Sequence, residues 1–155
     1  MQAQRYLSPG KVLAEVNRLL ISDFPSARFV TLIYAIADPE SRTLNFANAG
    51  HVYPLLIDKN GSKFLETESG MPLGLMECEY SQLRITMEPG SRLFLYTDGV
   101  TEAVNISGEE YGDERILVHA AKPDSSVSTL YADIARFSAG TAVADDITVV
   151  TIESV

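Results

Sequence analysis

Residues 93–102 read LFLYTDGVTE, an apolar run that ends in an acid and a glycine. The apolar run predicts a strand, and the Asp98–Gly99 pair predicts that the chain turns where this strand ends. A carboxylate held at the end of a rigid strand is well placed to bind a metal ion, because hard cations prefer oxygen ligands. An Asp-Gly pair after a strand is also an ordinary turn, so the pair alone leaves both interpretations open.

A second acidic motif, Asp145–Asp146, directly precedes the apolar run at residues 147–152 (ITVVTI). In an extended chain neighbouring side chains point to opposite faces, so at most one of these two acids is expected to share a site with Asp98. Two carboxylates at strand ends would suit Mg²⁺ or Mn²⁺. The alternative is a pair of solvated loop acids.

The remaining pattern predicts an α+β fold, with short strands joined by tight turns in antiparallel hairpins. Helical spacing of apolar residues predicts a helix at residues 9–21, with Ser8 as its cap, and helices near 116–120 and from 127, capped by Ser125 or Ser126. The predicted strands cover residues 29–36, 43–48, 53–57, 63–66, 82–87, 92–96 and 147–152. Of these, 29–36 and 147–152 are expected to be buried on both faces, and 82–87 on one.

Other candidate residues are weaker. His51, after the turn Asn48-Ala49-Gly50, could shuttle protons, but a local structural role is the more common one for such a histidine. His119 is expected to be structural. The loop Gly70-Met71-Pro72-Leu73-Gly74 lacks the Lys and Ser or Thr of a phosphate-binding loop. Cys78 has no neighbouring base in the sequence, so covalent catalysis has little support.

Composition indicates one globular domain over residues 1–155, because 46% of the residues are hydrophobic. The net charge of −9 argues against binding to nucleic acid or to an anionic membrane surface. We found no apolar run long enough to span a membrane and no signal peptide, and the single cysteine excludes an internal disulfide. We therefore expect a cytoplasmic protein.

Taken in order, five stretches closely resemble the later part of the metal-dependent protein serine/threonine phosphatase (PPM) family, in its bacterial SpoIIE-like branch. They are residues 29–36 (FVTLIYAI), 48–51 (NAGH), 70–74 (GMPLG), 96–103 (YTDGVTEA) and 144–148 (ADDIT). The resemblance implies an antiparallel β-sandwich flanked by helices, with two Mn²⁺ or Mg²⁺ ions that activate a water for attack on a phosphoester. It implies that Asp98 and Asp145 are metal ligands, supported by Gly99, Asp146 and His51.

The family also has a Gly-Asp pair and an Asp-Val-x-Gly-x-Gly motif in an earlier segment, and neither occurs before residue 29. The only Gly-Asp pair, Gly112-Asp113, follows Asp98 and is therefore out of place. We expect a domain that lacks its N-terminal part, with half of the metal ligands, weak metal binding and little activity of its own. Sheet edges left open by the absent strands favour a homodimer.

The resemblance further implies a substrate, namely phosphoserine or phosphothreonine on a regulatory protein of the anti-sigma-factor-antagonist kind. The chain would then act in bacterial signal transduction as part of a longer protein. The alternative is a non-catalytic, phosphatase-like module for interaction or dimerisation.

Overall fold

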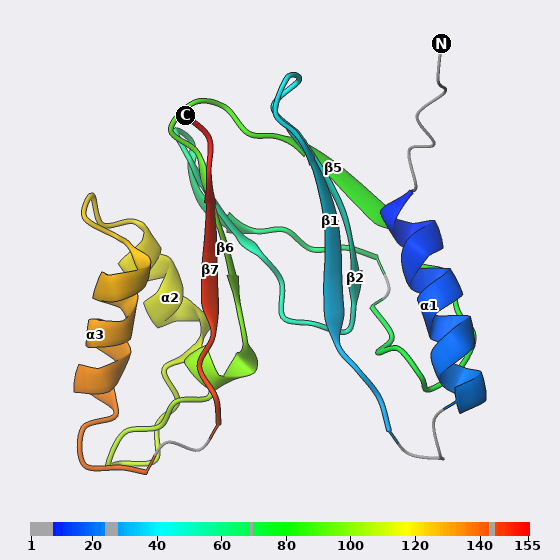
Figure 1. Cartoon of the computed structure of the whole chain (residues 1–155). Helices are drawn as coiled ribbons and strands as arrows, with labels where there is room; N and C mark the ends of the chain where they lie inside the picture. The colour runs from blue at the N-terminus through cyan, green and yellow to red at the C-terminus, as the bar shows by residue number, and fades with distance from the viewer. Residues whose placement is uncertain (1–7, 24–27, 69, 143–144) are drawn as a thin grey trace. The chain divides into compact units, whose positions relative to one another are not determined.

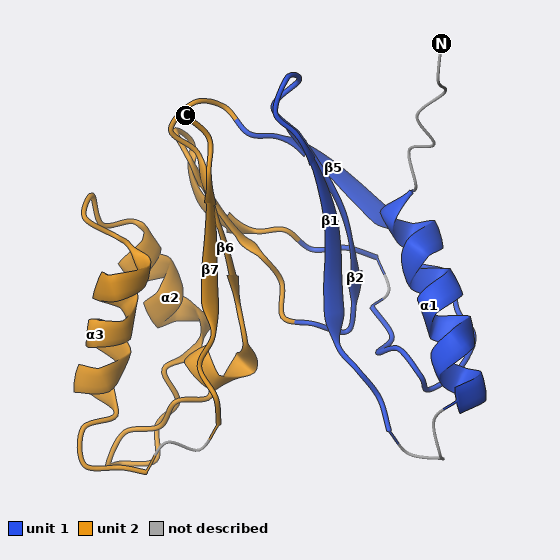
Figure 2. Cartoon of the chain, viewed as in Figure 1, with its two compact units in different colours: residues 1–51, 66–87 blue, residues 52–65, 88–155 orange. Residues whose placement is uncertain are grey.

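The structure, a computed structural model, describes residues 8–23, 28–68, 70–142 and 145–155 (Figure 1). Its internal contacts divide the chain into two compact units (Figure 2). Unit 1 comprises residues 1–51 and 66–87, and unit 2 comprises residues 52–65 and 88–155. Each unit has its own antiparallel sheet, and the assignment of both to a single domain stays a prediction.

Unit 1 consists of a helix packed on a sheet. The helix is α1 (Pro9–Asp23), and the strands are β1 (Leu32–Asp38), β2 (Thr43–Ala49) and β5 (Gln82–Thr86), in the order β1-β2-β5. Helix α1 lies against β1 and β2 (Figure 1). The core between them contains Leu13, Ala47, Ala49, Leu73 and Tyr80.

Unit 2 holds the second sheet and two helices. Its strands are β3 (Leu55–Asp58), β4 (Gly61–Phe64), β6 (Arg92–Tyr96) and β7 (Val149–Glu153), in the order β4-β3-β6-β7. Helices α2 (Gly112–Ala120) and α3 (Val127–Phe137) lie beside this sheet (Figure 1). The core contains Leu55, Phe94, Tyr96, Val100, Tyr111, Ile116, Ala120, Leu130 and Ile134.

The predicted α+β class, with antiparallel sheets and flanking helices, is confirmed, and each predicted strand run overlaps an observed strand. Ser126, rather than Ser125, caps α3 through a reciprocal pair of hydrogen bonds with Thr129. Strand β5 alternates exposed and partly buried residues, as expected for one wet face. Among the described residues, no helix has the length and apolar character needed to cross a membrane.

The prediction that residues 29–36 and 147–152 are buried on both faces is wrong. Strand β1 lies at one edge of its sheet and β7 at one edge of the other, and both consist of partly buried and exposed residues, with none fully buried. Val150, for example, is 50% exposed. An apolar run shows that a segment favours a sheet, but it does not show which place in the sheet the segment takes.

The loop at residues 70–76 is fastened to α1 by Asn17, whose side chain is buried. The Asn17 Nδ2 donates to the carbonyl of Met76 (2.9 Å), and its Oδ1 accepts from the amide of Gly74 (2.7 Å). Leu73 pairs with Val30 through two backbone hydrogen bonds. Expected from the sequence only as a shaped loop, this segment takes its shape from a buried amide and a short β-bridge.

Gly10→Ala should destabilise the protein although alanine is the better helix former. In an open helix this change stabilises by about 1 kcal/mol. Here a Cβ at Gly10 would lie 2.1 Å from the carbonyl oxygen of Tyr80, so backbone must move. We expect a loss of roughly 1–3 kcal/mol in the free energy of unfolding, measured by urea denaturation.

Lys11→Ala is the matched control, because Lys11 is exposed on the same helical turn. It should change the free energy of unfolding by less than about 0.5 kcal/mol. A Gly10→Ala protein more stable than the wild type would show that α1 does not pack this closely on the segment around Tyr80.

Candidate metal centre

Asp98 lies immediately beyond the end of β6, on a fixed turn. Residues Asp98–Val100 form a short 3₁₀ helix, and the carbonyl of Asp98 accepts a hydrogen bond from the amide of Glu102 (2.8 Å). Its carboxylate Oδ1 accepts from the amide of Gly99 (3.1 Å). The Asp98 residue is exposed, so a rigid backbone presents a carboxylate to solvent.

The Asp145–Asp146 segment is fixed along its backbone. Thr97 donates two hydrogen bonds to it, from its hydroxyl to the carbonyl of Asp146 and from its amide to the carbonyl of Thr148. The Tyr131 hydroxyl donates a third, to the carbonyl of Ile147. The Asp145 Oδ1 accepts from the amide of Asp146 (2.7 Å). Both acids are exposed, so this segment also presents carboxylates from an ordered backbone.

Gly99 brings the two acidic segments into direct contact. A Cβ at this buried position would lie 2.6 Å from the carbonyl oxygen of Asp146 and 3.1 Å from its carbonyl carbon. Asp145 and Gly99 also line one small cavity together with Glu102. The structure therefore places Asp98 and Asp145 on adjoining backbone segments, although they are far apart in the sequence.

The carboxylate oxygens of Asp98 and Asp145, on adjoining segments, are the kind of ligand that a hard divalent ion prefers. The set is small: among the described residues, no group of three or more His, Cys, Asp or Glu side chains could hold a metal ion together. A centre with two metals needs more ligands than Asp98 and Asp145 provide.

His51 belongs to unit 1, whereas Asp98, Gly99, Asp145 and Asp146 all belong to unit 2. The turn at residues 48–51 is closed by the side chain of Asn48. It donates a hydrogen bond to the His51 carbonyl and accepts one from the His51 amide, both at 2.8 Å. Gly50 has φ +70° in this turn. The local structural interpretation of the Asn48–His51 motif thus has direct support, and a supporting role of His51 at the metal centre stays a prediction.

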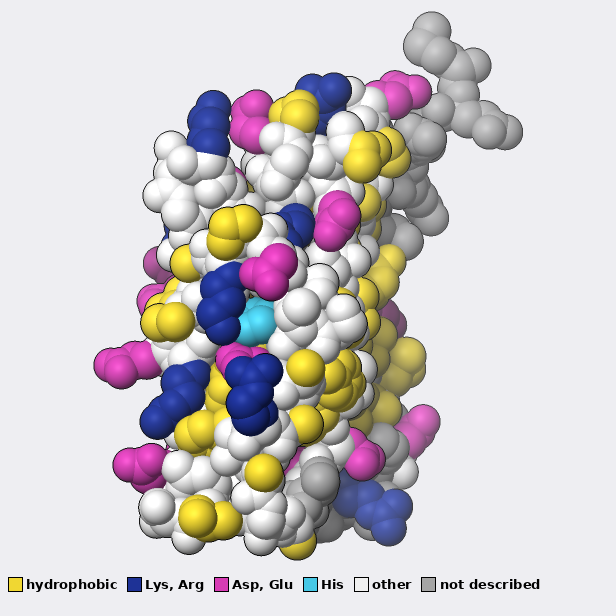
Figure 3. All heavy atoms as spheres, turned by 90° about the vertical axis from the view of Figure 1, so that its left-hand side faces the viewer, with side chains coloured by type: hydrophobic (Ala, Val, Ile, Leu, Met, Phe, Trp, Pro, Cys, Tyr) yellow, Lys and Arg dark blue, Asp and Glu magenta, His cyan; other side chains and the backbone are white. Residues whose placement is uncertain are grey.

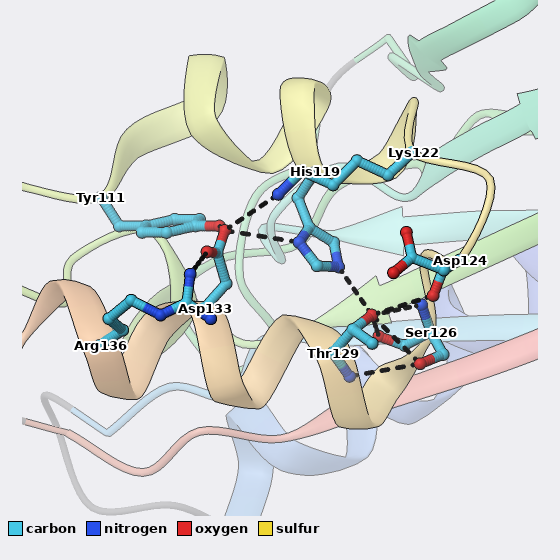
Figure 4. A network of polar contacts seen from close by, with 8 residues as sticks. All are labelled: Tyr111, His119, Lys122, Asp124, Ser126, Thr129, Asp133 and Arg136. Carbon is cyan, nitrogen blue, oxygen red and sulfur yellow. Dashed lines mark hydrogen bonds and ion pairs between the residues drawn. The ribbon is translucent and has the colours of Figure 1, made fainter.

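Sequence reasoning missed a second polar cluster, which joins α2 to α3 (Figure 4). Asp133 Oδ2 accepts from the Tyr111 hydroxyl (2.8 Å) and lies 3.4 Å from Nδ1 of the buried His119 and 3.7 Å from Nζ of Lys122. Arg136 lies 3.3 Å from the other carboxylate oxygen. Acidic and basic side chains are interspersed on the face drawn in Figure 3.

These partners determine the protonation of Asp133. Its partial burial raises the pKa, but the hydrogen bond from Tyr111 and the nearby Lys122 and His119 outweigh burial, and the net pKa is lowered. Burial and the hydrogen bond to Asp133 raise the pKa of Tyr111. The cluster therefore favours an ionised carboxylate beside a neutral phenol, and it serves to hold the two helices together.

Asp133→Asn should lower the free energy of unfolding at pH 7 by roughly 1 kcal/mol, since it removes a charged hydrogen-bond acceptor and an ion-pair partner. A carboxyl group with a lowered pKa in the folded state contributes stability above its unfolded pKa, about 3.9, and loses it as the pH falls through the folded pKa. The difference between wild type and variant should therefore shrink below about pH 4.

Urea denaturation from pH 7 down to pH 3 measures this difference. Asp124→Asn is the matched control, because Asp124 is exposed and its carbonyl, not its carboxylate, accepts a hydrogen bond from the α3 residue Thr129 (3.2 Å). If the free energy of unfolding differs between wild type and Asp133→Asn by the same amount across this pH range, the lowered pKa of Asp133 in the folded state is contradicted.

Comparison with known proteins gives consistent matches. A family model described as Stage II sporulation protein E (SpoIIE) matches residues 1–154. The chain is 28% identical over 104 residues to phosphoserine phosphatase RsbU of Bacillus subtilis (strain 168), covering 66% of this chain and 31% of RsbU. It is 33% identical over 106 residues to phosphoserine phosphatase RsbP of the same organism, covering 65% of this chain and 26% of RsbP. The chain thus spans about a third or less of these curated relatives.

Solved structures show the same fold. The SiaA-PP2C domain of Pseudomonas aeruginosa superposes with a TM-score of 0.81 at 21% identity, covering 97% of this chain and 62% of that one. The phosphatase domain of SpoIIE from Bacillus subtilis, presoaked with Mn, gives a TM-score of 0.69 at 16% identity, covering 97% of this chain and 67% of that one. The chain therefore has the fold of PP2C-type phosphatase domains.

Proposed function

Because the chain belongs to the stage II sporulation protein E (SpoIIE) family, we propose that it is the part of a protein phosphatase that supplies Asp98 and Asp145 to a Mn²⁺ or Mg²⁺ centre. One observation carries the proposal. The exposed carboxylates of Asp98 and Asp145 lie on two backbone segments that are far apart in the sequence. These segments meet at Gly99, and a hydrogen bond from the Thr97 hydroxyl to the Asp146 carbonyl joins them. The PPM resemblance predicts ligands at these same two acids.

Each residue has a distinct role in this proposal. The bound metal pair would lower the pKa of a water and stabilise charge on the phosphoryl group. Asp98 and Asp145 would hold the ions through their carboxylate oxygens. Gly99 lets the two segments approach, and Asp146 acts through its carbonyl, which accepts the Thr97 hydroxyl. No nucleophilic side chain is needed, in agreement with the absence of a sequence signal for covalent catalysis.

The proposed substrate is a phosphoserine or phosphothreonine on a regulatory protein, with the chain acting in cytoplasmic signalling as part of a longer protein. Support comes from the names of RsbU and RsbP, both phosphoserine phosphatases, and from the small share of each that the chain covers. The solved structure of the RsbU and RsbW domains of Rv1364c from Mycobacterium tuberculosis, with a TM-score of 0.74, joins such a domain to a second module.

The ligand count sets the expected strength of this activity. Two carboxylates leave most of the coordination shell of two divalent ions to water, so we expect weak metal binding and slow turnover by the 155-residue chain. The alternative function is a non-catalytic module that interacts with a regulator or dimerises. Within the described part of the chain, β1 and β7 each pair with one strand only, and this favours the alternative, since unpaired strand edges invite pairing with a second copy.

Phosphate release from a phosphoserine-containing protein or peptide tests the proposal. We expect slow release that requires added Mn²⁺ or Mg²⁺ and stops when EDTA removes the metal. Release that continues at the same rate in EDTA would contradict a metal-dependent reaction. Absence of release at every Mn²⁺ concentration would favour the non-catalytic module.

A further inference from the structure

Thr97 makes three hydrogen bonds to residues 146–148, and its hydroxyl makes two of them. Its hydroxyl donates to the carbonyl of Asp146 (2.9 Å) and accepts from the amide of Thr148 (3.0 Å). Its own amide donates to the carbonyl of Thr148 (3.1 Å). The register of β6 and β7, in which Tyr96 faces Val149, brings Thr97 opposite Thr148. The hydroxyl thus continues the strand pairing beyond the end of the sheet.

We propose that Thr97 is a positioning residue of the metal centre, whose hydroxyl holds the Asp145–Asp146 segment at a fixed place beside Asp98. This inference rests on the proposed function. Thr97 precedes Asp98 directly in the chain, and its hydroxyl donates a hydrogen bond to the carbonyl of Asp146. One side chain therefore links the two predicted ligand segments. Ions such as Mg²⁺ require nearly ideal octahedral geometry, so the relative placement of two carboxylates affects affinity directly.

A purely structural role for the hydroxyl is the competing explanation, and Thr151 provides the comparison. Thr151 lies on β7, opposite Phe94 of β6, in the sheet that ends next to Thr97. Its hydroxyl is buried and has no hydrogen-bond partner among the described residues. Strand β7 therefore pairs normally although the hydroxyl of Thr151 makes no hydrogen bond among the described residues. The hydroxyl of Thr97, by contrast, is hydrogen-bonded to the Asp146 carbonyl and the Thr148 amide, beyond the end of the β6–β7 pairing.

Paramagnetic broadening of backbone amide signals by Mn²⁺ tests the proposal, because it detects weak binding and does not depend on catalysis. In the wild type we expect the amide signals of Gly99 and Asp146 to broaden together at the same Mn²⁺ concentration. Thr97→Val keeps the shape of the side chain and removes the hydroxyl. It should raise the Mn²⁺ concentration needed for half broadening about tenfold, as is typical when a group that orients a metal ligand is lost.

Two variants separate positioning from folding. Thr97→Ser keeps the hydroxyl and should behave like the wild type, within about twofold. Thr151→Val makes the same Thr-to-Val change within the neighbouring strand β7 without removing a hydrogen bond, and it should also leave Mn²⁺ broadening unchanged. If Thr97→Val does not give a native spectrum, Thr97→Ala takes its place, with the same expected shift.

Three outcomes would overturn the positioning role of Thr97, and they differ in what they imply for the metal site. Equal broadening in the wild type and Thr97→Val would overturn the positioning role and leave the metal site standing. No selective broadening of Gly99 and Asp146 in the wild type would overturn the metal site and the positioning role together. Loss of the fold in both Thr97→Val and Thr97→Ala would also overturn the proposal, since the hydroxyl would then be a requirement of folding.

Discussion

Asp98→Asn should reduce metal-dependent phosphoserine hydrolysis by more than roughly 100-fold, which exceeds the usual effect of losing a group that only orients a ligand. The change replaces an anionic ligand by a neutral amide. It leaves the turn intact, because the Asn carbonyl can accept the same hydrogen bond from the Gly99 amide that the Asp98 carboxylate accepts. The free energy of unfolding should change by less than about 0.5 kcal/mol. Phosphate release and urea denaturation measure the two effects.

Asp58→Asn is the matched control for this variant. Asp58 lies in the β3–β4 turn of the same unit, and its Oδ1 likewise accepts a backbone amide, that of Asn60 (2.6 Å). The control should keep both its activity and its stability. Full activity in Asp98→Asn would show that the carboxylate is an ordinary turn acid and that hydrolysis occurs elsewhere.

Gly99→Ala should lower both metal affinity and stability. The new methyl group would lie 2.6 Å from the carbonyl oxygen of Asp146, closer than such atoms can approach, so the Asp145–Asp146 segment must move away from Asp98. Overpacking of this kind costs roughly 1–3 kcal/mol of unfolding free energy. Urea denaturation measures this loss, and Mn²⁺ titration should show at least about tenfold weaker binding.

Gly108→Asn controls for the loss of a glycine. Nothing lies within 4 Å of a Cβ there, and Asn tolerates the φ of +79° better than most residues. This variant should stay close to the wild type in both measurements. A Gly99→Ala protein with unchanged stability and Mn²⁺ binding would contradict the close approach of the two acidic segments.

Local pattern predicted the elements of this fold well, and their places in the sheets less well. The helical spacing at residues 9–21 and the cap at Ser126 are properties of a short segment, and the structure bears them out. The burial predicted for residues 29–36 was wrong because it depends on strand order. Among the residues that the structure describes, strand β1 has a neighbouring strand on one side only, which its own sequence does not reveal.

The same limit applies to the candidate site. The sequence singled out Asp98 and Asp145 by motif, but the approach of their two backbone segments depends on the register of β6 with β7, which no single motif contains. The roles of Thr97 and Tyr131 follow from that register. Asp133 went unnoticed because a lone acid in a helix is usually solvated, and only the packing of α2 on α3 brings Tyr111 and His119 to it.

The most direct test is a crystal of this chain soaked in Mn²⁺ and measured for anomalous scattering from the metal. The account predicts an ion bound by carboxylate oxygens of both Asp98 and Asp145, at the distance of about 2.1 Å typical of small divalent cations. An ion held by one of the two acids alone, or Mn²⁺ bound only elsewhere on the chain, would contradict it.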